Sequence, residues 1–422
     1  MLDIKFIREN TDFVKASLKS KNNDSDIDNI LDLDINRRKI ISTVEDLKAK
    51  KNIINKDISE LRKNNEDISK LVNDMKEVSI QIKEFDSELS NINKKLKSKL
   101  LYIPNLPHES VPLGKDETDN VVLREWGNKP NFNFQPKGHL ELAENNKLLD
   151  FKRSVKMSGT GFPLYTNLGA KLERALINFM LDVHTNEHGY TELFPPFLVT
   201  ENSPLTTGNL PKFKEDMYYV ELDNMYCIPT AEVPVTNMHS NEVLSESDLT
   251  KKYAAYSACF RREAGSYGKD TKGLLRVHQF NKVELVKFTK PNDSYNELES
   301  LLNDAESILQ KLNLHYRIVA LSTGDLSFSA AKCYDIEVWS PFENKYLEVS
   351  SCSNFESFQS RRGNIKFKNK KTNKLEFLHT INGSGLATPR LMVSLLETYQ
   401  NDDSSISIPD ILKPYLHFNK IC

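Results

Sequence analysis

Cysteine is scarce in this 422-residue chain, and its spacing fits no metal site. No two of the five cysteines form a C-x-x-C pair, and five is an odd number. This pattern argues against a disulfide framework and against a zinc site with cysteine ligands. We therefore expect a chain that needs neither zinc nor disulfide bonds. Its cysteines would stay reduced, as those of proteins in a reducing compartment do.

Long apolar runs and a strong net charge are also missing. No stretch approaches the roughly 18 consecutive apolar residues that favour a membrane span, and the first residues do not resemble a signal peptide. The 57 Lys and Arg residues nearly balance the 59 Asp and Glu residues, so a nucleic-acid site would have to be a local patch. Because 39% of the residues are hydrophobic, the chain can build a folded core. We expect a cytoplasmic protein without a membrane partner.

Glycine is absent from residues 1–104, and the only proline there is Pro104. A long charged stretch without these residues is typical of helices. Apolar residues from Ile68 to Leu96 alternate in steps of three and four, and a similar series covers residues 40–61. The polar residues 62–67 between the two series indicate a tight turn. The pattern predicts an antiparallel coiled-coil hairpin over about residues 30–100.

Three regions follow from this pattern. We expect a helical domain over residues 1–104, a Pro-, Gly- and Asp-rich connector over 105–137, and a mixed domain of helices and strands over 138–422. A coiled coil could serve for oligomerisation or as a spacer. Its basic residues, at 37–39 and 94–99 among others, could instead contact phosphates, although acidic residues are interleaved with them. The charge pattern leaves both interpretations open.

Charged and aromatic residues are concentrated in two expected strands between residues 259 and 288. Because residues two apart share a strand face, Arg261 and Glu263 should project together. By the same rule Arg276, Phe280 and Glu284 should line one face of the next strand. Arginines, an aromatic ring and a carboxylate on one antiparallel sheet could bind a nucleoside phosphate. A solvated hairpin with cross-strand ion pairs is the alternative.

Two later segments add further polar groups. Glu348 and the Ser351 hydroxyl suit a hard cation such as Mg²⁺. Residues 375–382 indicate a strand that enters a Gly-Ser-Gly triplet, and a helix follows near Arg390. Thr388 stands where a dinucleotide fingerprint would need its third glycine, which argues against a dinucleotide-binding fold.

Taken together, these segments resemble the bacterial-type seryl-tRNA synthetases, which are class II aminoacyl-tRNA synthetases. The likeness extends over essentially the whole chain, and its motifs are very specific in this order behind a coiled-coil arm. Residues 189–196 (GYTELFPP) are similar to class II motif 1, 260–263 (FRRE) to motif 2, and 383–390 (GSGLATPR) to motif 3. Residues 1–10, 103–108 (IPNLPH) and 230–234 (TAEVP) also resemble family segments.

One departure from the family pattern lies in motif 3. Many bacterial members carry Val-Gly before the motif arginine, whereas this chain has Thr388 and Pro389. Proline is tolerated in the first turn of a helix, where no N–H is needed. The departure therefore concerns the local loop geometry and leaves Arg390 in place.

The resemblance implies an α+β fold, in which a coiled-coil hairpin precedes a class II catalytic domain. That domain would be an antiparallel sheet flanked by helices, with motif 1 forming a homodimer interface. The implied activity is that of a serine–tRNA ligase, which joins serine to ATP as seryl-adenylate and then transfers the seryl group to tRNA(Ser). By family resemblance tRNA(Sec) would be a substrate as well, and the arm would recognise tRNA by shape and backbone.

The resemblance also assigns residues to the two small ligands. Arg261 and Arg390 would be catalytic, and Glu348 with Ser351 would hold a Mg²⁺ ion bound with ATP. Glu232 would counter the ammonium of serine, and polar groups would select its hydroxyl, a mode that can reject the deoxy analogue by about 10⁴–10⁵. The ATP site would comprise Arg261, Arg262, Glu263, Arg276, Val277, Phe280, Glu348, Val349, Ser350, Ser351 and Arg390. The serine site would comprise Thr230, Ala231, Glu232, Glu284, Asn382 and Ser384.

Two alternatives belong to other functional classes. One is a paralogue that activates an amino acid and loads a carrier protein, but such relatives lack the long arm. The other is a catalytically inactive tRNA-binding regulator. The intact charged residues of the expected site argue against the second alternative, namely Arg261, Glu263, Glu284, Glu348 and Arg390.

Overall fold

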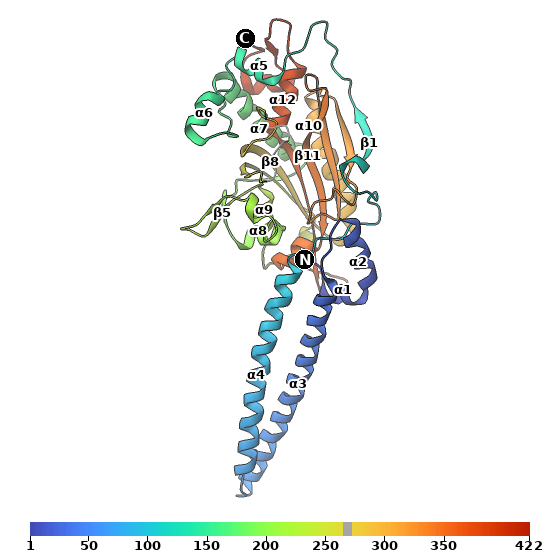
Figure 1. Ribbon diagram of the computed structural model, residues 1–422, viewed down its shortest axis with the longest axis vertical. Helices are drawn as coiled ribbons and strands as arrows, with labels where there is room; N and C mark the ends of the chain where they lie inside the picture. Colours follow the sequence, from blue (N-terminus) through green and yellow to red (C-terminus); the bar gives the residue numbers. More distant parts are fainter. Residues whose placement is uncertain (265–271) are drawn as a thin grey trace. The chain divides into compact units, whose positions relative to one another are not determined.

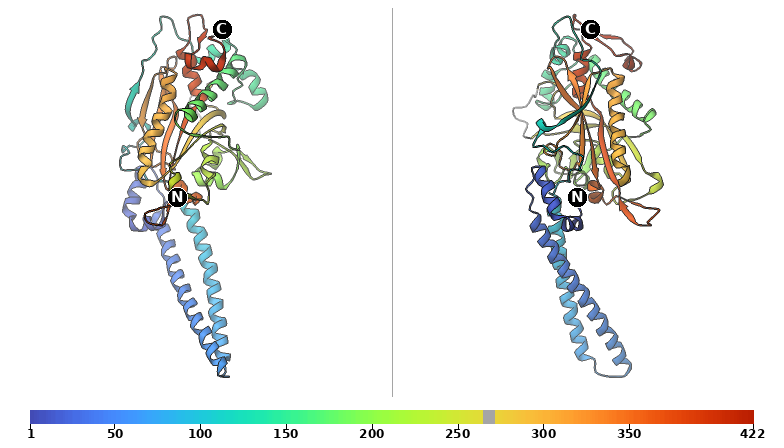
Figure 2. Two further views of the ribbon diagram at one scale, coloured as in Figure 1. Left: turned by 180° about the vertical axis from the view of Figure 1, so that it is seen from behind. Right: turned by 90° about the vertical axis from the view of Figure 1, so that its right-hand side faces the viewer.

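The computed structural model describes residues 1–264 and 272–422, and the chain divides into two compact units. The N-terminal unit comprises Met1–Lys19 and Asn23–Pro104, and the C-terminal unit comprises Ser20–Asn22 and Asn105–Cys422. Figures 1 and 2 show the chain coloured along its sequence. Among the described residues, no helix combines the length and the apolar character that crossing a bilayer requires.

Two short and two long helices make up the N-terminal unit. The short helices are α1 (Ile4–Glu9) and α2 (Thr11–Ser20), and the long ones are α3 (Ile27–Lys63) and α4 (Ser69–Leu100). With 37 residues, α3 is about 55 Å long. The two long helices lie side by side and run in opposite directions (Figures 1 and 2). The predicted hairpin is confirmed, and its turn covers residues 64–68, slightly later than expected.

The heptad pattern buries a line of side chains between the two long helices. Ile54, Ile58 and Val78 are buried there. Arg37 of α3 donates from Nε to Asn93 Oδ1 of α4 at 2.8 Å, which joins the two helices farther along the arm. The partly buried residues around the apolar cluster are Leu47, Ile68, Leu71, Val72, Met75 and Ile82. Burial of this apolar line holds the arm together.

An eight-stranded sheet is the centre of the C-terminal unit. Its strand order is β1-β9-β10-β11-β14-β8-β7-β2, and every neighbouring pair is antiparallel except β2 and β7. Segments far apart in the sequence therefore lie on adjacent strands, and the predicted antiparallel sheet is confirmed. The strands are β1 (Val121–Trp126), β2 (Thr191–Leu193), β7 (Lys251–Phe260), β8 (Gln279–Thr289), β9 (Tyr316–Ala320), β10 (Lys332–Ser340), β11 (Lys345–Glu356) and β14 (His379–Ala387).

Three helices share the large hydrophobic core with this sheet. They are α7 (Asn167–Asn186), α10 (Ser294–Lys311) and α12 (Thr388–Thr398). The amphipathic spacing within α7 predicts this helix, and Gly189 follows it with a φ of 71° that glycine adopts readily. The shorter helices are α5 (His139–Asn145), α6 (Phe151–Ser158), α8 (Asn202–Thr207), α9 (Glu232–Asn237), α11 (Phe358–Gly363) and α13 (Lys413–Leu416).

Short strands form three smaller sheets in the same unit, with the orders β13-β12-β6, β3-β5-β4 and β15-β16. These strands are β3 (Leu198–Thr200), β4 (Tyr219–Val220), β5 (Met225–Cys227), β6 (Val243–Ser245), β12 (Lys366–Lys368), β13 (Leu375–Phe377), β15 (Ile406–Ser407) and β16 (Lys420–Ile421). The 3₁₀ helices are η1 (Glu117–Asp119), η2 (Lys214–Asp216), η3 (Glu246–Asp248), η4 (Pro291–Asp293) and η5 (Asp410–Leu412).

Residues 105–137, expected as a connector, also supply a strand of the main sheet. β1 pairs with β9 at the sheet edge, with Val121 opposite Ala320 and Trp126 opposite Tyr316. The Trp126 ring stacks on the Tyr316 ring, with their centroids 5.7 Å apart. This segment therefore belongs to the packed sheet and is more than a link.

Candidate active site

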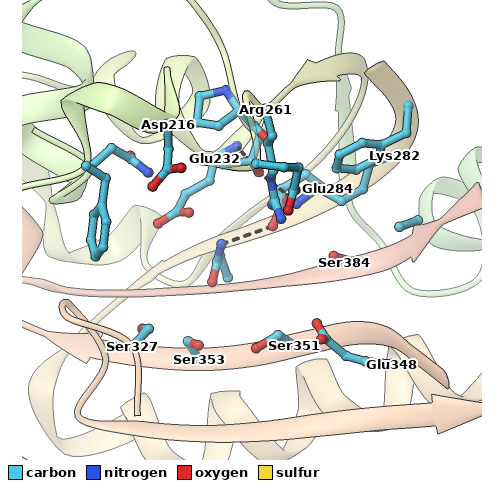
Figure 3. Close-up of a pocket in the computed structure, with 18 of the residues that line it drawn as sticks. Asp216, Glu232, Arg261, Lys282, Glu284, Ser327, Glu348, Ser351, Ser353 and Ser384 are labelled. Carbon is cyan, nitrogen blue, oxygen red and sulfur yellow. Dashed lines mark hydrogen bonds and ion pairs between the residues drawn. The ribbon is translucent and has the colours of Figure 1, made fainter. Parts of the chain in front are cut away.

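A cavity of about 680 Å³ lies along strands β8, β11 and β14 of the main sheet (Figure 3). Its volume is in the range of pockets that hold a small ligand. Residues of β8, β11 and β14 line it, together with the segments that follow β7 and begin α9 and α12. The predicted site residues among its lining are Thr230, Glu232, Arg261, Glu263, Arg276, Val277, Phe280, Glu284, Glu348, Val349, Ser351, Asn382, Ser384 and Arg390.

Strand β8 presents three side chains to the cavity by simple alternation. Phe280, Lys282 and Glu284 all line it, as every second residue of a strand should. Arg276 lines the cavity as well, but it precedes β8, which begins at Gln279. The prediction that one regular strand includes Arg276 is therefore wrong, although its side chain reaches the expected site.

The segment after β7 brings positive charge beside an aromatic face. β7 ends at Phe260, so Arg261 and Glu263 follow the strand instead of lying in it as expected. Glu263 has a φ of 53°, and its carboxylate forms an ion pair with Arg276. The Arg261 guanidinium lies 5.2 Å from the centroid of the Phe280 ring, a cation–π distance.

Two β-bulges turn residues three apart toward the same side. Between β10 and β11 the pairing omits Val349, so Glu348 and Ser351 both reach the cavity. Between β14 and β8 the register shifts between Ser384 and Ala387, and both of these residues line the cavity. The bulges thus add polar groups that strict alternation would direct to opposite faces of the sheet.

Glu284 is the centre of a hydrogen-bonded cluster inside the cavity. Its side chain is nearly buried, and Thr230 Oγ donates to Glu284 Oε2 at 2.6 Å while Asn382 Nδ2 donates to Oε1 at 3.0 Å. Lys282 forms an ion pair with the same carboxylate. Ser384 lies directly opposite Glu284 on the neighbouring strand. Two of the polar residues expected to bind serine, Thr230 and Asn382, therefore converge on the Glu284 carboxylate.

A second carboxylate, Glu232, stands at the first residue of α9 on the same side of the cavity (Figure 3). Burial raises the pKa of Glu232 to about 7, and the negative Glu284 acts in the same direction. Hydrogen bonding to Gln359 and the positive charges of Lys282 and Arg261 act in the opposite direction. Such a group titrates near neutral pH and would ionise when a cation enters the cavity.

Arg390 extends from the first turn of α12 toward strand β11. The helix begins at Thr388, and Pro389 occupies the first turn as the sequence predicts. Arg390 Nη1 donates to the Glu348 carbonyl oxygen at 3.0 Å and lies 3.4 Å from a Glu348 carboxylate oxygen. Arg390 Nε donates to the Leu275 carbonyl oxygen at 3.1 Å. These bonds fix the guanidinium beside the cavity.

Glu348 and Ser351 offer a carboxylate and a hydroxyl on one side of strand β11 (Figure 3). Hard oxygen ligands of this kind fit Mg²⁺, which usually binds one or two carboxylates together with phosphate oxygens. The donor set expected for Mg²⁺ is therefore chemically suitable. Both residues also line the cavity that a nucleotide would enter.

Another group of potential metal ligands lies elsewhere in the C-terminal unit. Ligand atoms of His139, Glu343 and Glu397 all lie within 4.8 Å of one another. The Glu397 carboxylate, however, accepts hydrogen bonds from the His139 backbone N–H, the Ser340 hydroxyl and the Phe342 backbone N–H. Glu397 is thus occupied in joining α12 to α5 and to the end of β10.

Three of the predicted site residues do not line the cavity. Ala231 is fully buried, and Ser350 points its hydroxyl away to donate to the Ser384 carbonyl oxygen at 2.7 Å. The Arg262 guanidinium lies 5.9 Å from the Tyr218 ring. In this arrangement Ala231 and Ser350 lie behind the walls of the cavity, and Arg262 is exposed outside it.

Some residues of the site were missed by the sequence analysis. Lys282 stands two residues before Glu284, so strand alternation could have identified it. Asp216 lines the cavity and accepts hydrogen bonds from the backbone N–H groups of Arg262 and Ala264, at 2.9 and 3.0 Å. No local pattern marks Asp216, because its partners lie more than 40 residues farther along the chain.

Two models of known protein families match this chain, one over its N-terminal region and one over its C-terminal region. The family model described as the Seryl-tRNA synthetase N-terminal domain matches residues 1–107. The model described as the tRNA synthetase class II core domain (G, H, P, S and T) matches residues 216–399.

Curated relatives and solved structures are similar over nearly the whole chain. A serine–tRNA ligase of Syntrophobacter fumaroxidans is 55% identical, with 99% of this chain and 98% of the relative covered. One of Geobacillus kaustophilus is 54% identical, with the same coverage. The crystal structure of seryl-tRNA synthetase from Pyrococcus horikoshii complexed with ATP has a TM-score of 0.94 and 38% identity, covering 100% of this chain and 99% of that one. A cytoplasmic serine–tRNA ligase of Naegleria fowleri in complex with AMP has a TM-score of 0.89 and 27% identity, covering 100% and 98%.

Proposed function

The chain belongs to the seryl-tRNA synthetase family and acts as a serine–tRNA ligase, and from this premise we propose how its residues divide the work. Serine and ATP give seryl-adenylate and pyrophosphate, and the seryl group then passes to the 3′ end of tRNA as the bond to the α-phosphate breaks and AMP leaves. The observation that supports our assignment of the site is the convergence of Thr230, Asn382 and Lys282 on Glu284 within the cavity. Neither a carrier-protein paralogue nor an inactive regulator would account for the high identity to serine–tRNA ligases over the full chain.

Serine binds, in our proposal, beside Glu284 and Glu232. The serine hydroxyl forms hydrogen bonds with the polar side chains around Glu284, namely Thr230, Asn382 and Ser384 together with Glu284 itself. The serine ammonium faces Glu232. Alanine would leave these buried polar groups unpaired, and the cost of such unpaired groups excludes the deoxy analogue. Ala231 contributes by fixing the backbone between Thr230 and Glu232.

ATP occupies the remainder of the cavity in this proposal. The adenine ring stacks on Phe280, its amino group donates to Glu263, and the backbone at Val277 completes the slot. Arg390 binds the γ-phosphate, and Arg276 binds phosphate once it separates from Glu263. The ion pairs Glu263–Arg276 and Arg390–Glu348 keep these charges compensated until the nucleotide replaces them.

Arg261 acts on the reacting centre. When the serine carboxylate attacks the α-phosphate in line, negative charge grows on the phosphate oxygens, and Arg261 stabilises it. Its stacking on Phe280 holds the guanidinium in place beforehand. Arg262, Val349 and Ser350 shape the walls of this site and contribute through the backbone.

Glu348 and Ser351 would hold Mg²⁺ bound with ATP. When bound, the ion would neutralise charge on the phosphates. The bulge at Val349 turns both ligands to the same side, and this supports the assignment. A Glu348→Gln variant should need a higher Mg²⁺ concentration for half-maximal activity, whereas an unchanged Mg²⁺ requirement would contradict the assignment.

ATP–pyrophosphate exchange tests the catalytic assignment. Arg261→Ala should reduce serine-dependent exchange by about 10²–10³, the usual effect of removing one preorganised charge contact. Arg153→Ala is a matched control, because Arg153 is an exposed arginine paired with Asp150 and does not line the cavity. Equal exchange with alanine or threonine would overturn the substrate assignment, and full activity of Arg261→Ala would overturn its role.

We further propose that the arm formed by α3 and α4 binds tRNA(Ser). The many lysines near residues 48–51 and 94–99 could contact tRNA phosphates. Deleting residues 36–98 should leave exchange largely intact and abolish charging of tRNA, and charging by the shortened chain would refute this role. Use of tRNA(Sec) stays a prediction from the family resemblance, and location in the cytoplasm stays a prediction from the composition of the sequence.

A homodimer is the last part of the proposal. Phe194, which directly follows β2 at the edge of the main sheet, is 76% exposed, and Leu198 is 43% exposed. Phe194 in motif 1 and Leu198, two residues after the motif, would be covered by a second copy. Phe194→Asp should shift the sedimentation coefficient from that of a dimer to that of a monomer, and a wild-type chain that sediments as a monomer would refute the dimer.

A further inference from the structure

We propose that Gln359, a buried residue behind the cavity, positions the Glu232 carboxylate for the substrate ammonium and thereby sets the affinity for serine. The inference rests on the proposed role of Glu232. Gln359 is the second residue of α11, it has no exposed surface, and it is not part of the cavity lining. Of the residues proposed to bind serine, Gln359 forms a hydrogen bond to Glu232, so we expect its effect on serine to pass through that carboxylate.

The Gln359 side chain joins four separate segments. Its Nε2 donates to Glu232 Oε1 at 2.6 Å and to the Thr207 carbonyl oxygen at 3.3 Å. Thr380 Oγ donates to its Oε1 at 2.7 Å. One amide thus connects the end of α8, the start of α9, α11 and strand β14.

These partners fix the orientation of the amide. An amide nitrogen carries two N–H donors, and both have acceptors here, in Glu232 and Thr207. A flipped amide would place its carbonyl oxygen against a carboxylate and another carbonyl, which are acceptors only. Thr207 and Thr380 are themselves buried, so the arrangement cannot easily relax. Gln359 is consequently a donor of fixed direction toward Glu232.

The charges around Glu232 make this donor important. Glu284 faces Glu232 with the same charge, while Lys282 and Arg261 face it with the opposite charge. Lys282 is already paired with Glu284. A hydrogen bond from Gln359 favours the ionised form of Glu232, which is the form that attracts an ammonium. Without Gln359, protonation and rotation of Glu232 would both weaken the contact with serine.

Serine-dependent ATP–pyrophosphate exchange of the full chain provides the test. Gln359→Met keeps the length of the side chain and removes both donors. The KM for serine should rise about 10- to 100-fold, as expected for loss of a charge-assisted hydrogen bond, while the KM for ATP should stay within about twofold. The matched control is Gln400→Met, because Gln400 is also buried and donates to the Lys137 and Glu397 carbonyl oxygens away from the cavity. It should leave the serine KM unchanged.

The pH profile and a double-mutant cycle separate positioning from a general structural effect. In wild type the serine KM should fall as pH rises through about 7, where Glu232 ionises, and in Gln359→Met this fall should occur at higher pH. In a Glu232→Gln background, Gln359→Met should add less than about twofold. Equal rises in the KM values for serine and ATP, or a full effect in that background, would overturn the inference.

A second variant covers the case in which Gln359→Met does not fold. Thr380→Val removes only the donor to Gln359 Oε1, and the serine KM should rise by about two- to fivefold with the ATP KM unchanged. An unchanged serine KM would overturn the inference. Wild-type exchange that does not depend on serine would instead overturn the proposed function, so the two failures are distinguishable.

Discussion

Replacing Glu173 by glutamine should stabilise the chain at pH 8 and change its stability little at pH 5. Glu173 lies on α7, where it is 5% exposed, and Asn281 Nδ2 and Thr388 Oγ both donate to its Oε1. Its Oε2 is buried and has no hydrogen-bond partner among the described residues. Burial raises the pKa of Glu173 from its ordinary value of 4.5 to about 7.

The sign and the size of the effect follow from this shift. The folded chain binds the Glu173 proton more tightly than the unfolded chain does, so stability falls as pH rises from about 4.5 to 7 and then stays low. With pKa values of 4.5 unfolded and about 7 folded, the loss of stability between pH 5 and pH 8 is on the order of 2–3 kcal/mol. Glutamine keeps an oxygen for the two donors and carries no charge, so it escapes this loss.

Scanning calorimetry at pH 5 and pH 8 measures the difference. Glu173→Gln should raise the midpoint of thermal unfolding relative to wild type by about 3 °C more at pH 8 than at pH 5. Glu221→Gln, at an exposed turn, is the matched control and should show no pH-dependent gain. If the gain of Glu173→Gln were the same at both pH values, the reasoning about the raised pKa of this buried carboxyl would be refuted.

Two further predictions concern the cavity, and a third concerns packing beside the main sheet. Because Glu232 ionises near pH 7, the wild-type KM for serine should fall by about tenfold between pH 6 and pH 8, and a flat profile in the exchange assay would contradict its role. Phe280→Ala should raise the KM for ATP about tenfold through lost stacking on the base and leave the serine KM nearly unchanged, so equal changes in both would refute the assignment. In Gly385→Ala the new Cβ would lie 2.5 Å from His184 Nε2, so urea denaturation should show a loss of about 1–3 kcal/mol, and unaltered stability would contradict this packing.

Local periodicity explains what could be predicted of the fold. The hairpin depends on contacts between residues that repeat every three or four positions, so the seam through Val78 could be read directly from the sequence. Strand β8 likewise shows its alternation in the sequence, and Phe280 and Glu284 face the cavity as expected. Strand β1 was missed because it lies in a segment expected as a connector, and its strand conformation depends on pairing with β9, which is distant in the sequence.

The parts of the site that could not be predicted depend on contacts between distant segments. The bulge at Val349 depends on pairing with β10, and the residue types around it do not predict a bulge. Gln359 resembles any other glutamine in the sequence until α8, α9 and β14 surround it. Arg261 was identified as a phosphate ligand from the residue pattern and as catalytic from the motif resemblance, whereas its position beyond the end of β7 depends on where that strand stops pairing.

The strand order of the main sheet has a consequence for synthesis on the ribosome. The arm needs only two helices that are consecutive in the sequence, so it can form as soon as residues 27–100 have emerged. The cavity, in contrast, needs β8, β11, β14 and the start of α12, and therefore cannot exist until Arg390 has been translated. A stalled or truncated product would thus display a finished arm with no means of activating an amino acid, and it would compete with complete copies for whatever the arm binds.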